Sequence, residues 1–319
     1  MNRYPTLRWV AAATALCLVA SGCGDEKRPA ASSDSLTVAS PPAVAAIPQL
    51  DLLDGKVFPI EAYKLTPEKF RQLNNAQTIL ANRCLSRFGF PPSLQQVPPT
   101  LPPDTSLSRR YGITDPATAA KYGYHQSAGD GAQASRPPAE PVSKELSLVL
   151  YGPPDQTGDA NGNTGGTAHK GVEIPAGGCM GESKRKLNAA EYERIDPEQF
   201  AGDIELAAGK QADADPRVRG KFAEWSTCMK GKGFDYRDPF QPLDGDTLKT
   251  SLAQPTPTAV EIQTAVADVE CKQQVNLVGV WFAVESAYEE RLIEKNQERL
   301  AGIKRAIDAM LKAAAGVTG

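Results

Sequence analysis

The sequence predicts a mainly α-helical protein: an irregular helical domain with long loops, two disulfides and a long C-terminal helix. Three observations predict it. Several segments open with Thr-Pro or Asp-Pro, the arrangement of a helix cap followed by proline in the first turn. Residues 261–315 contain no proline. Four cysteines lie beyond residue 50, an even number that suits two disulfides in an oxidising compartment.

The first half should contain three helices separated by loops. Thr66-Pro67 opens a helix that should stop at Gly89, and a proline-rich loop follows over residues 91–104. A short helix should open at Asp115-Pro116 and end at Gly123, and a short apolar element over 143–151 is more typical of a helix than of a strand. Residues 152–178 are rich in Gly and Asn, so we expect a loop.

The second half should be almost entirely helical. Helices are expected near 179–194, 197–212 and 216–231. Thr258 and Glu261 have the spacing of a capping box, in which each residue's side chain bonds the backbone N–H of the other. From there the chain should be helical to near residue 315, with a break near 276–279 because one continuous helix would reach about 80 Å.

The end of this region carries a heptad stripe. Its residues are Ile293, Leu300, Ile307 and Ala314, with Ile303 and Met310 between them. Such a stripe is compatible with an amphipathic helix lying on its own domain, the reading that we favour, or with self-association through 293–314. Asn296 falls within the stripe and would weaken a long coiled coil.

The N-terminus has the pattern of a secretory signal. Arg3 and Arg8 precede about twelve uncharged, mostly apolar residues, too few for a membrane-spanning helix of roughly twenty. The run ends in Leu18-Val-Ala-Ser-Gly-Cys23, which resembles the lipobox of bacterial lipoproteins. That resemblance implies cleavage before Cys23, acyl chains on its thiol and attachment to the outer face of a membrane.

The expected organisation is therefore a signal peptide over residues 1–22, a lipidated tether over 23–50 and a helical domain over 51–319. Residues 23–50 are rich in Ala, Ser and Pro, a composition typical of a disordered linker. The domain could divide into sub-units at 51–195 and 196–319.

The charge balance makes nucleic acid an improbable partner. After residue 22 the chain carries 33 basic and 38 acidic residues, a net charge of −5. Nucleic-acid binding favours clustered Lys and Arg, and no polybasic segment is present for anionic lipid. Membrane attachment should therefore depend on the acyl chains at Cys23.

A cysteine unit occurs twice. Cys84 and Cys228 are each followed by a large apolar residue, then three residues, Gly and Phe. The glycine suits a left-handed helix end, and the Phe after it can fold back onto the last turns. Three connectivities are possible for four cysteines. The parallel between the units favours Cys84–Cys179 and Cys228–Cys271, each joining the end of one helix to the start of another.

Four segments carry a family resemblance: RRYGITDPATAAKYGYH, IPAGGCMGESKRKL, WSTCMKGKGFDYRDPF and ADVECKQQVNL. They are similar to a lipoprotein family of Streptomyces and related actinobacteria, over most of the chain after the tether. The resemblance implies no activity. It implies a Gram-positive envelope, and hence the outer leaflet of the cytoplasmic membrane.

Few residues are suited to catalysis or metal binding. His169 lies in a Gly/Asn loop and should be solvated, and His125 should be packed or hydrogen-bonded in a loop. Residues 159–170 start like a calcium loop but lack its Gly and its final Glu. We therefore expect no metal site, no catalytic residue and no cofactor.

The charged runs are interpreted as surface. Four glutamates at helical spacing, interspersed with Arg291 and Lys295, should form a solvated face rather than an acid/base pair. They are Glu285, Glu289, Glu290 and Glu294. The basic run 184–186 should be a surface patch.

The aromatic residues give one candidate surface. Trp225 and Trp281 lie in apolar helical patterns and should belong to the core. Residues 109–125 combine arginines and tyrosines in a loop setting, which makes them the best candidate ligand surface, although structural packing is the favoured interpretation. The candidate residues are Arg109, Arg110, Tyr111, Tyr122, Tyr124 and His125.

These observations favour a lipid-anchored envelope protein that binds or scaffolds a protein or cell-wall partner without catalysis. The first alternative is a cell-wall-acting enzyme that uses two carboxylates about 5–10 Å apart in a cleft. The second alternative is a small-molecule-binding lipoprotein of a transporter, which a two-lobed α/β pattern would favour.

Overall fold

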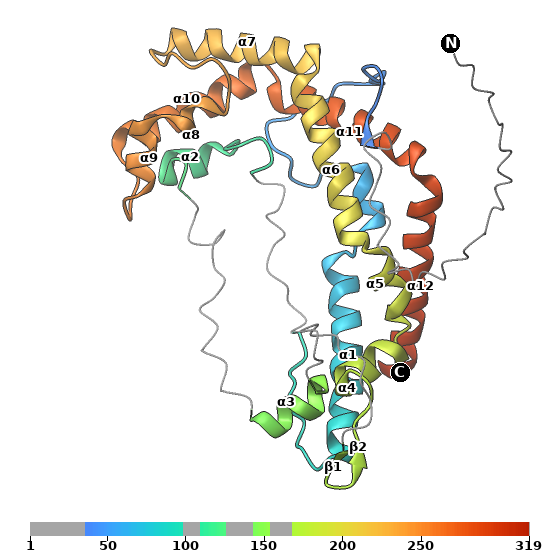
Figure 1. Cartoon of the computed structure of the whole chain (residues 1–319). Helices are drawn as coiled ribbons and strands as arrows, with labels where there is room; N and C mark the ends of the chain where they lie inside the picture. The colour runs from blue at the N-terminus through green and yellow to red at the C-terminus, as the bar shows by residue number, and fades with distance from the viewer. Residues whose placement is uncertain (1–35, 98–108, 126–142, 154–167, 319) are drawn as a thin grey trace, which may run out of the picture. The chain divides into compact units, whose positions relative to one another are not determined.

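The helices begin where the sequence places their caps. The computed structural model describes residues 36–97, 109–125, 143–153 and 168–318. Thr66 caps α1 (Pro67–Arg87) by accepting a hydrogen bond from the Lys69 N–H, and Asp115 caps α2 (Pro116–Tyr122) in the same way through Thr118. The mainly α-helical class is confirmed (Figure 1).

The remaining elements follow in chain order. The first half also contains the 3-10 helix η2 (Pro59–Tyr63) and α3 (Lys144–Tyr151). The middle of the chain contains β1 (Ala168–His169), β2 (Val172–Glu173), α4 (Gly178–Lys186), α5 (Ala189–Ile195), α6 (Pro197–Ala214) and α7 (Pro216–Gly231). The last part contains α8 (Gln241–Asp244), α9 (Asp246–Leu252), α10 (Ala259–Gln274), α11 (Leu277–Lys295) and α12 (Gln297–Thr318).

Two expected elements differ from the structure. The segment near 179–194 is two helices, because Asn188 adopts a left-handed conformation with φ of 58° and ends the run after α4. The expected loop over 152–178 contains an antiparallel hairpin, β1–β2, in which His169 pairs with Val172. His169 is half-buried rather than solvated, since its ring lies 5.4 Å from Phe90.

The long C-terminal helix is broken at two asparagines. Asn276, with φ of 53°, separates α10 from α11 within the expected break, and Asn296 separates α11 from α12. The heptad stripe is buried on the chain's own core. Its buried residues are Leu300, Ile303, Ile307, Met310 and Ala314. This burial favours the amphipathic-helix interpretation over self-association.

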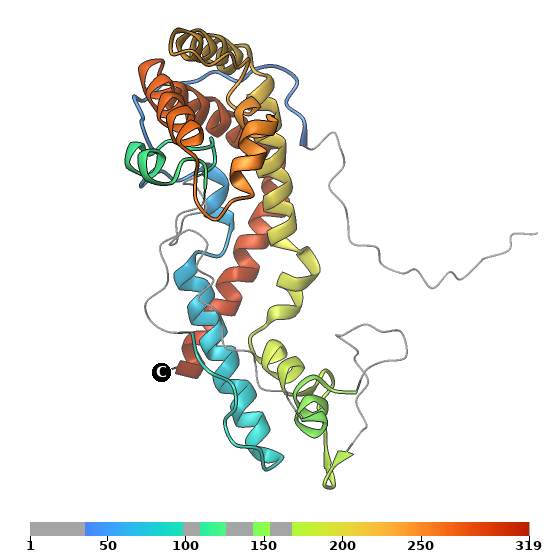
Figure 2. The ribbon, with the colours of Figure 1, turned by 90° about the vertical axis from the view of Figure 1, so that its left-hand side faces the viewer.

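The largest core surrounds α11. This helix lies along α6 and α7 (Figure 2), and both Trp225 and Trp281 are buried in the core, as expected. A second group of contacts joins α1 to α12, α4 and α3. Because α1 packs on α12, the possible division at residue 195 does not separate two independent sub-units.

Two disulfides have the pairing that the repeated unit favoured, Cys84–Cys179 and Cys228–Cys271. The first joins the end of α1 to the start of α4, as expected. Cys271 lies instead in the last turn of α10, so the second disulfide joins the ends of two helices and not an end to a start. Gly89 and Gly233 have φ of 80° and 89°, the left-handed geometry for which glycine carries no Cβ penalty. The Phe90 N–H bonds the Leu85 carbonyl and the Phe234 N–H bonds the Met229 carbonyl, so both helix ends are Schellman motifs.

The prediction of a tether over residues 23–50 does not hold for residues 36–50. We call residues 36–50 the strap, because this segment is ordered and its Leu36, Val38, Val44 and Leu50 pack against the main core. The tether prediction is wrong for the strap. Cys23 and residues 24–35 lie outside the described residues. No helix in the described part of the chain is long and apolar enough to cross a membrane.

Candidate functional site

The glutamates of α11 divide into two pairs. Glu290 and Glu294 are exposed, as expected. Glu285 and Glu289 are 1% and 0% exposed, so the prediction of a solvated face is wrong for these two. They face inward because α6, η2 and the segment 109–114 cover this side of α11, a packing that helical spacing alone does not disclose.

Arg110 connects the buried carboxylate of Glu285 to a half-buried carboxylate, that of Glu205. Its guanidinium donates to Glu205 of α6 and to Glu285 of α11. The Tyr111 hydroxyl donates to the other Glu285 oxygen at 2.7 Å, and its ring stacks on Trp281 with centroids 4.4 Å apart. These contacts dock the segment 109–111 on the core. Burial alone would lower the pKa of Arg110, but the adjoining carboxylates raise it.

Glu289 is the one carboxylate in this group with an unsatisfied oxygen. Its Oε2 accepts the Ile60 N–H at 3.0 Å, while its Oε1 is buried and has no hydrogen-bond partner in the described part of the chain. Burial, with the neighbouring charge of Glu285 adding to it, raises the pKa of Glu289 to about 8. At neutral pH this group is therefore an uncharged acid inside the core.

A second polar cluster forms around Glu261 of α10. Its Oε1 accepts the Tyr124 N–H at 2.8 Å and faces Nδ1 of His125 at 2.7 Å, and its Oε2 accepts the Ser251 hydroxyl. Nε2 of His125 lies 3.0 Å from the Gln254 carbonyl. Both ring nitrogens face acceptors, an arrangement that favours the imidazolium, and these contacts raise the pKa of His125.

The capping box is therefore only half formed. Thr258 accepts from the Glu261 N–H, but the Glu261 carboxylate turns away and the Thr258 N–H bonds Ser251 instead. Ser251, Glu261 and His125 are the residue types of a hydrolase triad, yet the serine bonds the carboxylate rather than the imidazole. Ser251 is also buried, so this arrangement is a structural clamp.

A third cluster is fully buried at Asp268. Its carboxylate accepts from Trp225 at 2.9 Å, and from Tyr124 and Lys272 at 3.0 Å each. The Lys272 ammonium also donates to the Ile113 carbonyl at 2.9 Å. Burial raises the pKa of Asp268, and the ammonium and hydrogen bonds oppose that shift.

The six residues of the candidate ligand surface make inward contacts and do not form an open binding surface. Arg109 donates to the carbonyls of Tyr124 and His125, and the polar groups of Arg110 and Tyr111 are engaged as described above. Tyr122 is half-buried, with the Lys121 ammonium 4.8 Å from its ring centroid. The structure brings these residues together as inward contacts, which agrees with the packing interpretation favoured from the sequence.

The buried glutamates of the enzyme alternative do not line the pockets next to the strap and at residues 294–299. Neither of these two pockets in the described part of the chain includes Glu285, Glu289 or Glu261. The described residues contain no group of three or more His, Cys, Asp or Glu side chains placed to hold a metal ion. The calcium-like segment 159–170 begins outside the described residues.

The strap is held by side-chain amides, an arrangement that the sequence analysis missed. Gln211 of α6 accepts the Val38 N–H at 2.7 Å and donates to the Leu36 carbonyl at 3.2 Å. Asn276 accepts the Leu50 N–H at 3.1 Å and donates to the Pro48 carbonyl at 3.0 Å. Each amide thus pairs with an extended backbone as a neighbouring strand would.

The same device holds residues 91–97 on α1. Asn75 exchanges two hydrogen bonds with Val97, and Asn82 exchanges two with Leu94. Seven helical residues and three extended residues both span about 10 Å, so the two asparagines match the spacing of their partners. The sequence offers a signal for this arrangement. Asn or Gln side chains on a helix can bond a neighbouring proline-containing segment, whose backbone does not form a strand pair of its own.

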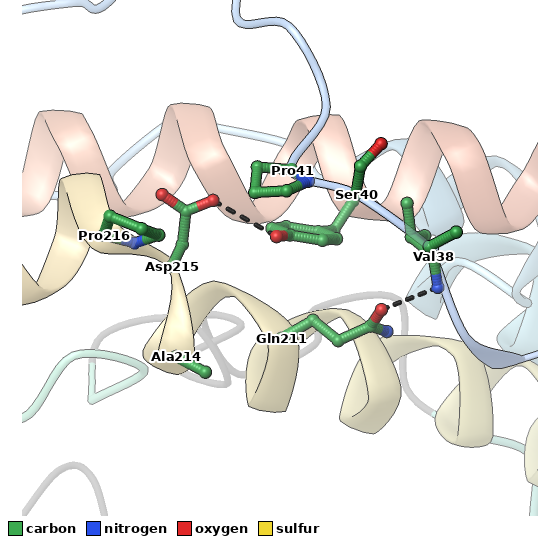
Figure 3. Close-up of a pocket in the computed structure, with 9 residues that line it drawn as sticks. Val38, Ser40, Pro41, Gln211, Ala214, Asp215 and Pro216 are labelled. Carbon is green, nitrogen blue, oxygen red and sulfur yellow. Dashed lines mark hydrogen bonds between the residues drawn. The ribbon is translucent and has the colours of Figure 1, made fainter.

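The strap crosses a pocket between α6, α7 and α11, of about 190 Å³ (Figure 3). It is lined by Val38, Ala39, Ser40, Pro41, Gln211, Ala214, Asp215, Pro216 and Tyr288. Asp215 accepts from Arg217 at 2.7 Å and from the Tyr288 hydroxyl at 3.1 Å. Burial opposes ionisation of Asp215, but the Arg217 contacts lower its pKa, so its charge is already balanced.

Two further side chains donate hydrogen bonds to the backbone of the strap. The Arg217 guanidinium donates to the Pro42 carbonyl at 2.9 Å, and the Lys295 ammonium donates to the Thr37 carbonyl at 2.8 Å. Gly279 lies where the strap approaches α11, and a Cβ there would meet the Pro48 carbonyl at 2.0 Å. We call this surface of α6, α7 and α11 the strap groove.

No protein-family model, curated protein or solved structure matches the chain.

Proposed function

We propose that the chain is a lipid-anchored extracytoplasmic protein that binds or scaffolds a partner in the cell envelope without catalysis. The observation that carries the binding role is the contrast between the two kinds of site. The ionisable groups suited to chemistry are used as internal clamps, at Arg110, Glu261 and Asp268. The strap groove, in contrast, holds an extended chain segment on the surface.

The compartment is proposed from the cysteines. The lipobox-like end of the signal supports lipid attachment at Cys23, and the two disulfides suit an oxidising environment. The resemblance to actinobacterial lipoproteins supports the outer leaflet of the cytoplasmic membrane.

The anchor is tested with Cys23→Ser. We expect wild-type protein in the membrane fraction and Cys23→Ser protein, folded and disulfide-bonded, in the soluble extracellular fraction. Thiol titration of the denatured, unreduced soluble variant should find no free thiol. Misfolded variant protein, or wild-type protein that is soluble without lipid, would contradict the separation of anchor and domain.

The binding role is tested by cross-linking in intact membranes followed by mass spectrometry. We expect reproducible cross-links to one protein partner or to wall polymer. The cell-wall enzyme is the competing outcome: release of wall fragments by the purified protein, abolished by Glu285→Gln but not by Glu290→Gln, would replace the binding proposal.

A further inference from the structure

We propose that the strap groove is a binding site for an extended segment of a partner polypeptide, and that the strap is an internal ligand which this segment displaces. The inference rests on the binding function proposed above, and names the chemical class of its partner. Three observations lead to it: how the groove recognises the strap, how the strap fits the pocket, and where the strap lies in the chain.

The groove recognises backbone atoms. Four side chains of the groove bond carbonyl or N–H groups of the strap backbone. They are Gln211, Arg217, Asn276 and Lys295. Another extended segment offers the same backbone groups, so recognition of this kind tolerates a change of sequence.

The strap fits the groove incompletely. It passes the pocket with Ala39 and Ser40, and Figure 3 shows the Ser40 hydroxyl directed away from Asp215. The polar groups at the pocket already have partners, since Asp215 is bonded by Arg217 and Tyr288. The apolar wall that remains when the strap leaves comes from Ala214 and Pro216. A partner with a large apolar or aromatic side chain at this position would fill a space that the strap leaves empty.

The position of the strap makes displacement possible without unfolding the helical core. The strap is the first described segment after residues 23–35, and it contains no α-helix and no strand. Of its residues only Pro42 is fully buried. Releasing it would therefore expose few fully buried side chains.

The test uses the full mature chain with Cys23→Ser, and fluorescent 15-residue peptides of the sequence 36–50. Two peptides carry Phe, at Ala39 or at Ser40, and a third is unchanged. The strap of the protein is weakened by Val38→Ser and Val44→Ser, which remove inward side chains of the strap but no part of the groove. Thermal melting establishes that each variant is folded.

We expect saturable binding of at least one Phe peptide to the strap-weakened chain. This affinity should be at least tenfold higher than the affinity of the same peptide for the chain with the wild-type strap, because that strap competes in cis. It should also be at least threefold higher than the affinity of the unchanged peptide for the strap-weakened chain. Adding Gln211→Ala should reduce the affinity at least tenfold. Adding Gln199→Ala should leave it unchanged, because this exposed residue of α6 bonds Asp203 outside the groove.

Absence of saturable binding by the folded strap-weakened chain would overturn the proposal. So would equal affinity for all three peptides, or insensitivity to Gln211→Ala. Concentration-dependent dimers of the strap-weakened chain would instead assign the groove to a second copy's strap. A cross-linked envelope partner whose recovery is unaffected by Gln211→Ala would retain the proposed binding function and reject this groove.

Discussion

Replacing the buried acid Glu289 by glutamine should stabilise the protein. Glu289 is 0% exposed, accepts one hydrogen bond from the Ile60 N–H, and has a pKa raised to about 8 by burial and by Glu285. In the unfolded chain the same group titrates near its ordinary value of 4.5. Between these two pKa values the unfolded chain gains a favourable negative charge that the folded chain does not carry. Folding therefore loses stability as the pH rises.

The magnitude follows from the two pKa values. Each unit of difference corresponds to about 1.4 kcal/mol. At pH 7, about 2.5 units above the unfolded pKa, the free energy of unfolding is lowered by at most about 3 kcal/mol. Glu289→Gln keeps an oxygen for the Ile60 N–H and removes the titration. The gain should be near zero at pH 4, should grow through neutrality, and should level off above about pH 8.

The assay is urea denaturation at pH 4, 7 and 9 with both disulfides intact, for wild type, Glu289→Gln and Glu290→Gln. Glu290 is the neighbouring exposed residue of α11 and serves as the matched control, for which we expect little change. A Glu289→Gln variant that is less stable than wild type at pH 7, by an amount independent of pH, would refute the reasoning. That outcome would mean that the pKa of Glu289 is not raised in the folded protein.

Three further predictions concern how the helices meet. Gly178→Ala should destabilise the protein by about 2 kcal/mol or more in thermal melting, since a Cβ there would meet the Leu150 carbonyl oxygen at 2.5 Å and φ is 65°. Gly220→Ala, which has open space around it, should instead stabilise the protein by up to about 1 kcal/mol. Equal effects of the two substitutions would contradict the close approach at Gly178. Glu261→Ala should cost about 3 kcal/mol or more in urea denaturation, because it leaves several buried donors unpaired; a change below about 1 kcal/mol would argue against the clamp. His125→Ala should destabilise the protein more at pH 5 than at pH 9. The pKa of His125 is raised in the folded protein, so the stabilisation by the imidazolium is complete below the unfolded pKa of about 6.5 and is lost as the pH rises through the folded pKa. A loss of stability that does not depend on pH would show that the ring is neutral.

Local interactions explain what could be predicted from the sequence. Thr66, Asp115 and Asp215 cap helices because their side chains bond N–H groups two or three residues ahead. The Gly-Phe pairs after Cys84 and Cys228 end helices because the left-handed position and the return hydrogen bond lie within six residues. The cysteine pairing could be reasoned because the same local unit occurs twice.

The buried polar clusters could not be predicted in this way. The spacing of Glu285, Glu289, Glu290 and Glu294 is the same whether a helix face is solvated or covered. Partners decide it, and the partner Arg110 lies 175 residues away from Glu285. The inward direction of Arg110 depends in turn on where α6 and α11 meet.

The strap was misread for a related reason. Its Ala, Ser and Pro content is typical of linkers, because such residues make few hydrogen bonds to one another. Gln211 of α6 and Asn276, which lies between α10 and α11, supply hydrogen bonds to the strap from more than 150 residues later in the chain.

The sequence by itself therefore determined the capped helix starts, the two Gly-Phe helix ends and the two disulfides. Each of these is set by residues close together in the chain, or by a unit repeated within it. Only the tertiary structure decided which acids are buried, which face of 109–125 points inward and that residues 36–50 pack on the core. These properties depend on side chains that meet across long separations, where burial and hydrogen bonding to a distant partner outweigh local composition.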